Sequence, residues 1–363
     1  IIGSLHGISG ILEENMIDLK KESNANLEKV ALTPSSALGT VRKKPTVEDC
    51  KYIFQILHKY NVRYFFYIGG NDSAETTHII NQQANSGGYD LRCFHIPKTI
   101  DNDLRENDHT PGFGSAAKFV ASAFMGDNLD NRALPGVKIN VVMGRHAGFL
   151  TAASALARVY PDDGPHLIYL PERSFNIDSF TKDVQAVYNR LGRCVIAVSE
   201  GVVNDKHVPI AAAYTAEVDS HGNIQLSGTG ALGDLLVGML KKKTNISRVR
   251  ADTLGYLQRS FPGIISEVDA LEARQAGIFA VKQAVRRNID MSVAIKRKDQ
   301  KKYSSYLECV PLKKVARETR CMPASYINKA GNDVTKKFID YVRPLVGELP
   351  PIGQLKGVPI KKK

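Results

Sequence analysis

Residues 62–72, with the sequence VRYFFYIGGND, give the first indication of the fold. A run rich in aromatic and β-branched side chains stops abruptly at Gly69 and Gly70, and polar residues follow. A continuous apolar run with little alternation predicts a strand that is buried on both faces. Strands of this kind belong to parallel sheets whose two faces are covered by helices.

The same pattern recurs along the chain. Four further apolar runs each end in glycine or polar residues, at 94–97, 139–143, 167–170 and 194–198. Helical patterns lie between or beside them at 47–60, 115–125 and 146–160, and we expect Ser115 to be the N-cap of the second. Alternating strands and helices predict an α/β fold, doubly wound, with mostly parallel sheets. In the C-terminal part, the patterns predict strands near a sheet edge at 292–296 and 306–310 and a helix at 333–345.

Composition and charge exclude several classes of protein. No run of eighteen apolar residues occurs, so we expect no transmembrane helix and no membrane partner. The five cysteines are widely spaced and odd in number, which argues against a disulfide framework or zinc site and predicts a cytoplasmic protein. The net charge of +12 suits an anionic partner such as phosphorylated metabolites. No nucleic-acid-binding motif is present, so we expect no nucleic-acid partner.

The stretch 97–103, PKTIDND, has the residue types that phosphoryl transfer requires. One of the two carboxylates, Asp101 or Asp103, can accept a proton from a hydroxyl nucleophile, and the other can bind Mg²⁺. Lys98 supplies a compact positive charge for a phosphate group. The alternative is a turn or capping sequence, because Asp and Asn are common in turns.

Two other clusters also follow predicted strands. Gly69 and Gly70 allow backbone amides to approach a phosphate, although a tight turn would need the same glycines. In 143–148, MGRHAG, Arg145 can stabilise charge on a phosphoryl group, whereas we expect His146 to be structural. A third cluster, RADTLGYLQR at 250–259, contains two arginines that could bind phosphate, or it could be a surface strand with alternating charge.

These clusters resemble the phosphofructokinase family in order and spacing, over nearly the whole chain from Gly3 to Leu349. The matching words are PKTIDNDL at 97–104, MGRHAG at 143–148, SEG at 199–201 and GYLQRSFPG at 255–263. The resemblance implies two Rossmann-like domains. We expect a donor-binding domain at residues 1–135, a fructose 6-phosphate-binding domain at 136–300, and a C-terminal strand and helix at 301–363 that return to the first domain.

Within this family, the chain is most similar to the branch that uses pyrophosphate. Lys98 and Asp72 stand where ATP-dependent members typically carry glycine, and Tyr256 replaces a histidine common in bacterial ATP enzymes. Asp72 would repel the α-phosphate of ATP. The implied reaction is reversible transfer of a phosphoryl group from pyrophosphate to the 1-hydroxyl of fructose 6-phosphate. The alternatives are an ATP-dependent 6-phosphofructokinase and, more distantly, a non-catalytic phosphometabolite sensor or a basic nucleic-acid-binding protein.

The resemblance also implies roles for individual residues. Asp101 resembles the general base, with Lys98 and Arg145 stabilising the transition state. The donor site comprises Gly70, Asn71, Asp72, Lys98 and Arg42. The fructose 6-phosphate site comprises Thr99, Ile100, Asp101, Met143, Gly144, Arg145, Glu200, Arg250, Tyr256 and Arg259. The Mg²⁺ ligands would come from Asn71, Asp72 and Asp103. A homodimer or homotetramer is implied, since the family often borrows phosphate-binding arginines from a neighbouring subunit.

Two features depart from the family pattern. Asn71 stands where the family usually has a metal-binding aspartate, and a neutral amide binds Mg²⁺ more weakly. The family's first strand and its glycine-rich donor loop, which precede the segment matching Gly3–Asp18, are absent from this sequence. We therefore expect the sequence to be N-terminally incomplete.

Overall fold

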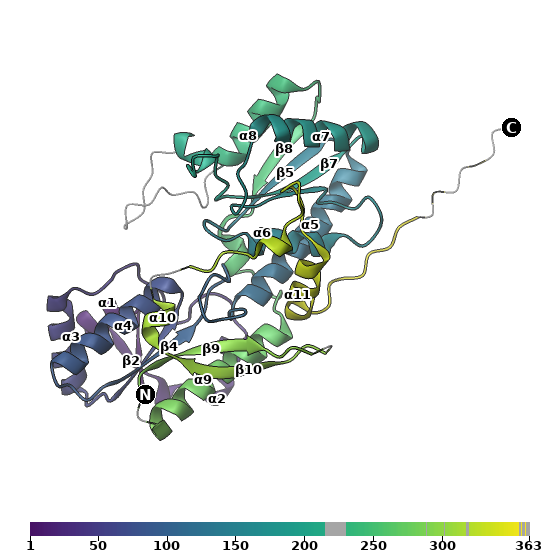
Figure 1. Cartoon of the computed structure of the whole chain (residues 1–363). Coiled ribbons are helices and arrows are strands. Elements are labelled where there is room, and N and C mark those ends of the chain that lie inside the picture. Colours follow the sequence, from purple (N-terminus) through teal and green to yellow (C-terminus); the bar gives the residue numbers. More distant parts are fainter. Residues whose placement is uncertain are drawn as a thin grey trace.

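Two four-stranded sheets form the framework of the molecule, which is shown as a computed structural model in Figure 1. The structure describes residues 1–214, 230–287, 289–300, 302–316, 319–355, 357 and 360. In the first sheet, the strand order is β10 (Ser305–Val310), β9 (Met291–Arg297), β4 (Arg92–Pro97) and β3 (Tyr64–Gly69). Its three strands β3, β4 and β9 run parallel, and β10 pairs antiparallel with β9 at the edge.

The second sheet is entirely parallel. Its strand order is β6 (Leu167–Tyr169), β7 (Cys194–Ser199), β5 (Val137–Val142) and β8 (Val249–Thr253). All six residues of β7 are buried, as expected for a central strand covered on both faces. The α/β architecture with mostly parallel sheets is therefore confirmed.

Long helices cover the two sheets and connect their strands. Two of them contact the first sheet: α4 (Asn71–Ser86) and α9 (Glu267–Arg287). Three contact the second sheet: α7 (Ile177–Leu191), α8 (Ala231–Lys243) and α5 (Phe113–Ala133), which also contacts α9. The other α-helices are α1 (Ile8–Leu12), α2 (Asn24–Ala31), α3 (Val47–Lys59), α6 (Phe149–Ala152), α10 (Leu312–Val315) and α11 (Lys336–Val346).

The remaining elements are short. A two-stranded antiparallel sheet pairs β1 (Ile2–Ser4) with β2 (Met16–Asp18). The 3₁₀ helices are η1 (Leu19–Lys21), η2 (Ala153–Ala157), η3 (Ile210–Tyr214), η4 (Gly255–Arg259) and η5 (Ala324–Tyr326). Among the residues that the structure describes, no helix has both the length and the apolar character needed to span a bilayer.

The C-terminal part of the chain connects the two sheets. After η4, the chain returns to the first sheet through α9 and β9, before residue 301, and continues into β10. It then runs through α10, which contacts α4, to α11, which contacts α5, α9 and η2 (Figure 1). Because α11 buries Phe338, Val342 and Leu345 in the largest apolar cluster, this return is firmly packed. The division of the chain into three segments stays a prediction.

Two helical details differ from the expectations. The predicted helix at 146–160 is broken into α6 and η2, because Gly148 donates its N–H to Glu172 and Ser154 Oγ donates to Thr151 O. Ser115 is not an N-cap, since α5 begins at Phe113. The carboxylate of Asp269 on α9 supplies the missing acceptors, taking hydrogen bonds from the N–H groups of Gly112 (2.8 Å) and Ser115 (2.9 Å).

Candidate active site

The loops after β3 and β4 meet at one edge of the first sheet. Gly69 on β3 lies opposite Pro97 on β4, and the Lys98 N–H donates to Gly69 O at 3.0 Å. A Cβ at Gly70 would lie 3.6 Å from the side chain of Thr99, so the two loops are in contact. The carboxyl ends of parallel strands thus bring together the glycine pair and the PKTIDND loop, the arrangement in which ligands bind in such sheets.

Asp101 and Asp103 flank a residue with left-handed backbone. Asn102, between them, has φ = 58° and is fully buried. Burial raises the pKa of Asp101, against the opposing effects of positive charges on Lys98, His146, Arg145 and Arg259. Burial and the neighbouring charge of Asp101 raise the pKa of Asp103 to about 7. Asp101 is therefore poised as a base near several cations, because an elevated pKa favours proton acceptance at neutral pH.

Lys98 stands beside Asp101 and within electrostatic reach of Arg259. Its side chain reaches solvent, but the surrounding protein removes enough water to lower the pKa of the ammonium group, and the charge of Arg259 acts in the same direction. Arg145 acts on both Asp101 and His146. Lys98 and Arg145 both act electrostatically on Asp101, and cations gathered around one carboxylate suit an anion that carries several charges.

Asn71 and Asp103 fit a magnesium ion. The Asn71 Nδ2 donates to Asp103 Oδ2 at 2.9 Å, whereas the buried Asn71 Oδ1 has no hydrogen-bond partner among the described residues. An orphaned amide oxygen beside a carboxylate is the type of ligand that Mg²⁺ accepts. The described residues contain no group of three His, Cys, Asp or Glu side chains arranged for a metal ion. Such a site would leave most coordination positions to water and substrate phosphates, as is usual for Mg²⁺.

Asp72 is placed differently from Asn71. Its carboxylate is exposed and forms an ion pair with Lys44 at 3.3 Å, and Lys44 also pairs with Glu75 at 2.6 Å. Asp72 shares a small hollow with seven neighbours: Val41, Arg42, Lys43, Lys44, Tyr67, Ser73 and Thr76. The structure thus brings Arg42 and Asp72 together, both of which we expect in the donor site. The first turn of α4 beside them has no side-chain cap, so its N–H groups are available to an anion.

The residues expected to contact the sugar lie at the ends of β5 and β7. Gly144 has φ = 143°, and its N–H donates to Glu200 Oε1 at 3.4 Å. The Met143 N–H donates to Gln258 Oε1 at 3.1 Å. Gln258 is buried and was not predicted, although it lies inside the GYLQRSFPG word. Glu200 and Gln258 therefore fix the backbone of the loop that carries Arg145.

The remaining expected residues are distributed over three elements. Tyr256 and Arg259 lie together on η4, with the guanidinium 4.6 Å from the ring centroid, as in a cation–π pair. Arg250 is exposed on the edge strand β8 and donates to the backbone O of Val249. Thr99 Oγ1 accepts a hydrogen bond from the Asp101 N–H at 3.2 Å, and Ile100 is buried in the core.

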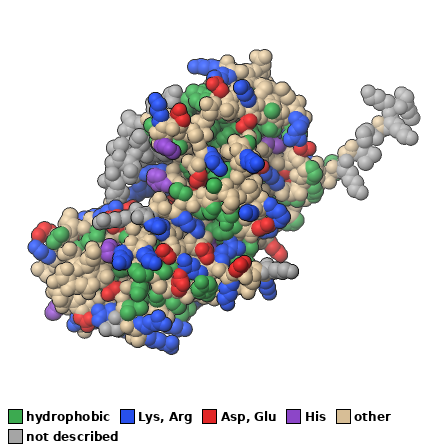
Figure 2. Space-filling model, viewed as in Figure 1, with side chains coloured by type: hydrophobic (Ala, Val, Ile, Leu, Met, Phe, Trp, Pro, Cys, Tyr) green, Lys and Arg blue, Asp and Glu red, His purple; other side chains and the backbone are tan. Residues whose placement is uncertain are grey.

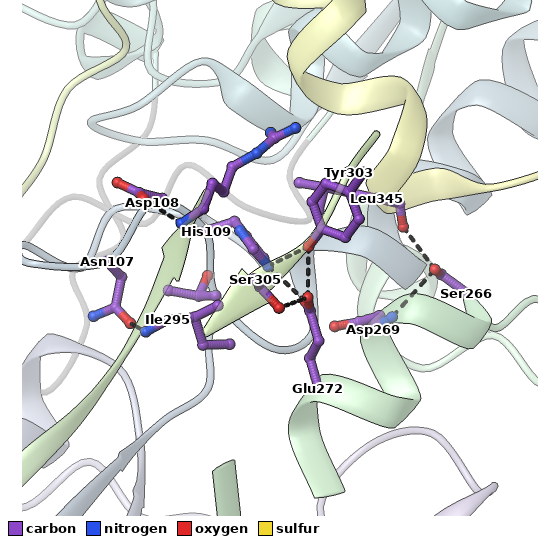
Figure 3. Close-up of polar contacts among 12 residues, drawn as sticks. Asn107, Asp108, His109, Ser266, Asp269, Glu272, Ile295, Tyr303, Ser305 and Leu345 are labelled. Atoms are coloured by element: carbon purple, nitrogen blue, oxygen red, sulfur yellow. Dashed lines mark hydrogen bonds and ion pairs between the residues drawn. The ribbon is translucent and has the colours of Figure 1, made fainter. Parts of the chain in front are cut away.

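A buried polar network behind the loop was missed by the sequence reasoning (Figure 3). Glu272 on α9 accepts hydrogen bonds from His109 (2.5 Å), Tyr303 (2.5 Å) and Ser305 (2.6 Å). The carboxamide of Asn107 and the backbone of Asp108 both bond to Ile295 on β9. No local motif marks these residues, because the partners are up to 188 positions apart in the sequence.

Comparisons with known proteins agree on one family. The phosphofructokinase family model matches residues 1–284. A pyrophosphate–fructose 6-phosphate 1-phosphotransferase of Rhodospirillum rubrum is 57% identical over 349 residues, covering 96% of this chain and 86% of the relative. The enzyme of the same name from Xanthomonas campestris is 37% identical, covering 100% of this chain and 90% of the relative. A crystal structure of a pyrophosphate-dependent phosphofructokinase from Nitrosospira multiformis has a TM-score of 0.84 and 30% identity, covering 99% of this chain and 86% of that one.

Proposed function

Because this chain belongs to the phosphofructokinase family, we propose that it transfers a phosphoryl group reversibly from pyrophosphate to the 1-hydroxyl of fructose 6-phosphate. The products are fructose 1,6-bisphosphate and phosphate. The observation that carries this proposal is the position of Asp101, a carboxylate with a raised pKa that lies within electrostatic reach of Lys98, Arg145 and Arg259. Relatives and structural neighbours named for the same pyrophosphate-dependent reaction support it.

The reaction that we propose gives each of these residues a role. Asp101 takes the proton of the sugar 1-hydroxyl. At the same time, the oxygen of that hydroxyl bonds to the terminal phosphorus of pyrophosphate. The bond from that phosphorus to the bridging oxygen breaks, and inorganic phosphate leaves with the electron pair. Lys98 and Arg145 neutralise charge on the transferring group. In the reverse direction, protonated Asp101 returns its proton to the sugar oxygen, for which a raised pKa is an advantage.

Magnesium would be held by Asp103 and the free Oδ1 of Asn71. When bound, it neutralises charge on the phosphate oxygens of the donor. Asp72 is directed toward Lys44 in this structure, so we assign it to donor selection rather than to metal binding. The negative charge of its carboxylate lies in the same hollow as Arg42 and Lys44. It would repel the additional phosphate charge that a nucleotide would bring there.

Sugar-phosphate binding is assigned to Thr99, Ile100, Met143, Gly144, Glu200, Arg250, Tyr256 and Arg259, together with Asp101 and Arg145. The exposed positions of Arg250 and Arg259 suit a site completed in a homodimer or homotetramer. The thiols of Cys50, Cys93 and Cys194 are free and buried, which suits a reducing cytoplasm. Figure 2 shows Lys and Arg side chains spread over the visible face with acidic side chains among them, an arrangement that favours small anions over nucleic acid.

The donor assignment is tested by measuring fructose 1,6-bisphosphate formation with Mg²⁺ and either pyrophosphate or ATP. We expect turnover with pyrophosphate to exceed turnover with ATP by at least about a hundredfold, and the Asp72→Gly, Lys98→Gly double variant to lose most pyrophosphate activity. The matched control is the Asp178→Gly, Lys243→Gly double variant, which removes an exposed ion pair on the second sheet. Greater turnover with ATP would reject pyrophosphate as the donor. An unchanged double variant would reject the roles of Asp72 and Lys98.

A further inference from the structure

The catalytic loop is held from behind by two side chains of the C-terminal segment. Tyr341 lies on α11, and Arg320 lies between α10 and η5, more than 200 residues after the loop. We infer that Arg320 and Tyr341 are positioning residues that set the geometry of Asp101 and Asp103. This inference rests on the proposed function, because it concerns the same phosphoryl transfer.

Asn102 is the residue through which Tyr341 acts. Its Oδ1 accepts a hydrogen bond from the Thr110 N–H at 3.1 Å, and its Nδ2 donates to Tyr341 Oη at 2.7 Å. Both ends of a fully buried side chain are thus fixed, one by the loop itself and one by α11. A left-handed backbone is uncommon for a residue with a side chain, and asparagine is among those that tolerate it. These two bonds hold Asn102 in that conformation, which sets the directions of the residues on either side.

Tyr341 also binds the far end of the loop, at Asp108. Its hydroxyl donates to Asp108 O at 2.7 Å while it accepts from Asn102, so one oxygen bridges the two ends of the segment 102–108. The ring is held in turn, since the Arg297 guanidinium lies 4.9 Å from its centroid and donates to Tyr341 O at 2.7 Å. The position of the hydroxyl is therefore determined by packing and does not depend on the loop alone.

Arg320 binds the backbone of the same segment at several points. Its Nη2 donates to Asn102 O (2.7 Å), and its Nη1 donates to Asn107 O (2.6 Å) and Asp108 O (2.9 Å). Its own N–H donates to Asp103 O at 2.6 Å. The guanidinium also stacks 4.8 Å from the ring centroid of Phe149, on α6. The planar guanidinium holds its two terminal nitrogens at a fixed separation and so reaches carbonyls at both ends of the segment, a geometry that the single nitrogen of a lysine does not reproduce.

The geometry matters because phosphoryl transfer depends on alignment. A displacement of about 1 Å at a reacting group can reduce the rate by about a hundredfold. Neither Arg320 nor Tyr341 belongs to the residues assigned to substrate contact, so their loss should act on kcat more than on substrate binding. The two residues also connect the loop to α6, which contacts β6 and β7 of the second sheet, and to α11, which contacts α5 and α9.

The test compares four variants of the full chain: Tyr341→Phe, Arg320→Lys, Arg320→Met and Tyr326→Phe. Tyr326 is the matched control, because its ring packs 5.4 Å from that of Tyr341 and lies outside the bonds to the loop described above. For Tyr341→Phe we expect kcat to fall at least about tenfold, with KM for both substrates within about twofold of the wild type. Arg320→Lys should retain more activity than Arg320→Met, and Tyr326→Phe should match the wild type.

Amide hydrogen exchange provides a readout that does not require activity. Residues 99–110 should exchange faster in Tyr341→Phe than in Tyr326→Phe. Unchanged kcat in Tyr341→Phe, a loss confined to KM, or an equal loss in Tyr326→Phe would overturn the inference. If the wild type shows no pyrophosphate-dependent turnover, the proposed function fails, and the exchange comparison still decides whether Tyr341 orders the loop. Should Arg320→Met not fold, Tyr341→Phe alone decides the outcome.

Discussion

Replacing Asp103 with asparagine should stabilise the folded protein and abolish its activity. Asp103 is 7% exposed, and its pKa rises from 3.8 to about 7 on folding. Between these values the folded state keeps a proton that the unfolded chain has released, so the free energy of unfolding falls by about 1.4 kcal/mol per pH unit. Full ionisation above pH 7 thus costs about 4 kcal/mol. Asparagine has the same size and no charge, and its oxygen can still accept from Asn71.

The assay is urea unfolding of the wild type and Asp103→Asn between pH 4.5 and 8.5, in EDTA so that no divalent cation contributes. The variant's advantage in free energy of unfolding should be small at the acid end and should approach its full value at pH 8.5. Asp340→Asn, at an exposed position on α11, controls for the general loss of one negative charge. An advantage that is independent of pH, or a variant less stable than the wild type at pH 8.5, would refute the reasoning. Pyrophosphate-dependent turnover, measured in parallel, should be lost.

Three further outcomes are expected. Asp101→Ser should reduce kcat by at least about a thousandfold while leaving the fold unchanged by circular dichroism, and substantial remaining turnover would count against a general base. Glu272→Gln should lower the free energy of unfolding by about 2–4 kcal/mol in urea, because its buried carboxylate accepts from three donors, and a change below about 1 kcal/mol would show that the network contributes little. Added Mg²⁺ should raise the unfolding midpoint of the wild type more than that of Asp103→Asn, whereas equal shifts would place the metal elsewhere.

Most strands of the two large sheets could be predicted because each is encoded by one continuous apolar run, whereas β8, with charged residues at alternate positions, has no such run. The apolar runs at 94–97 and 194–198 correspond to the cores of β4 and β7, and the polar words that follow them lie at the ends of those strands. The pairing of strands is a different matter. β4 pairs with β9 almost 200 residues later, and the Cys93 N–H donates to the Asp290 side chain. Nothing local to either strand specifies that partner, because pairing depends on how the intervening chain packs.

The failures of sequence reasoning share a physical cause. Ser115 has the right residue type for an N-cap, but the acceptor for that helix is Asp269, from α9. The ion pair between Asp72 and Lys44 was also not predicted, because the two residues lie 28 positions apart and no local spacing links them. Local propensity identifies a side chain that can satisfy a backbone group. It does not reveal a better placed competitor from another part of the chain.

The positions missed at the site are those that offset its electrostatic cost. Two carboxylates separated by a single residue are held at low exposure, and each raises the free energy of the folded state when ionised. Residues 98–112 form no helix and no long strand. The loop therefore has few backbone hydrogen bonds of its own to offset the free-energy cost of its two buried carboxylates. Stabilising contacts must therefore come from outside the loop, and they do, from α9 through Glu272 and from the C-terminal segment through Arg320 and Tyr341. The proposed catalytic residues form recognisable sequence motifs. The residues that hold them in place are scattered along the sequence, because any element that reaches the loop can provide the stabilising hydrogen bond.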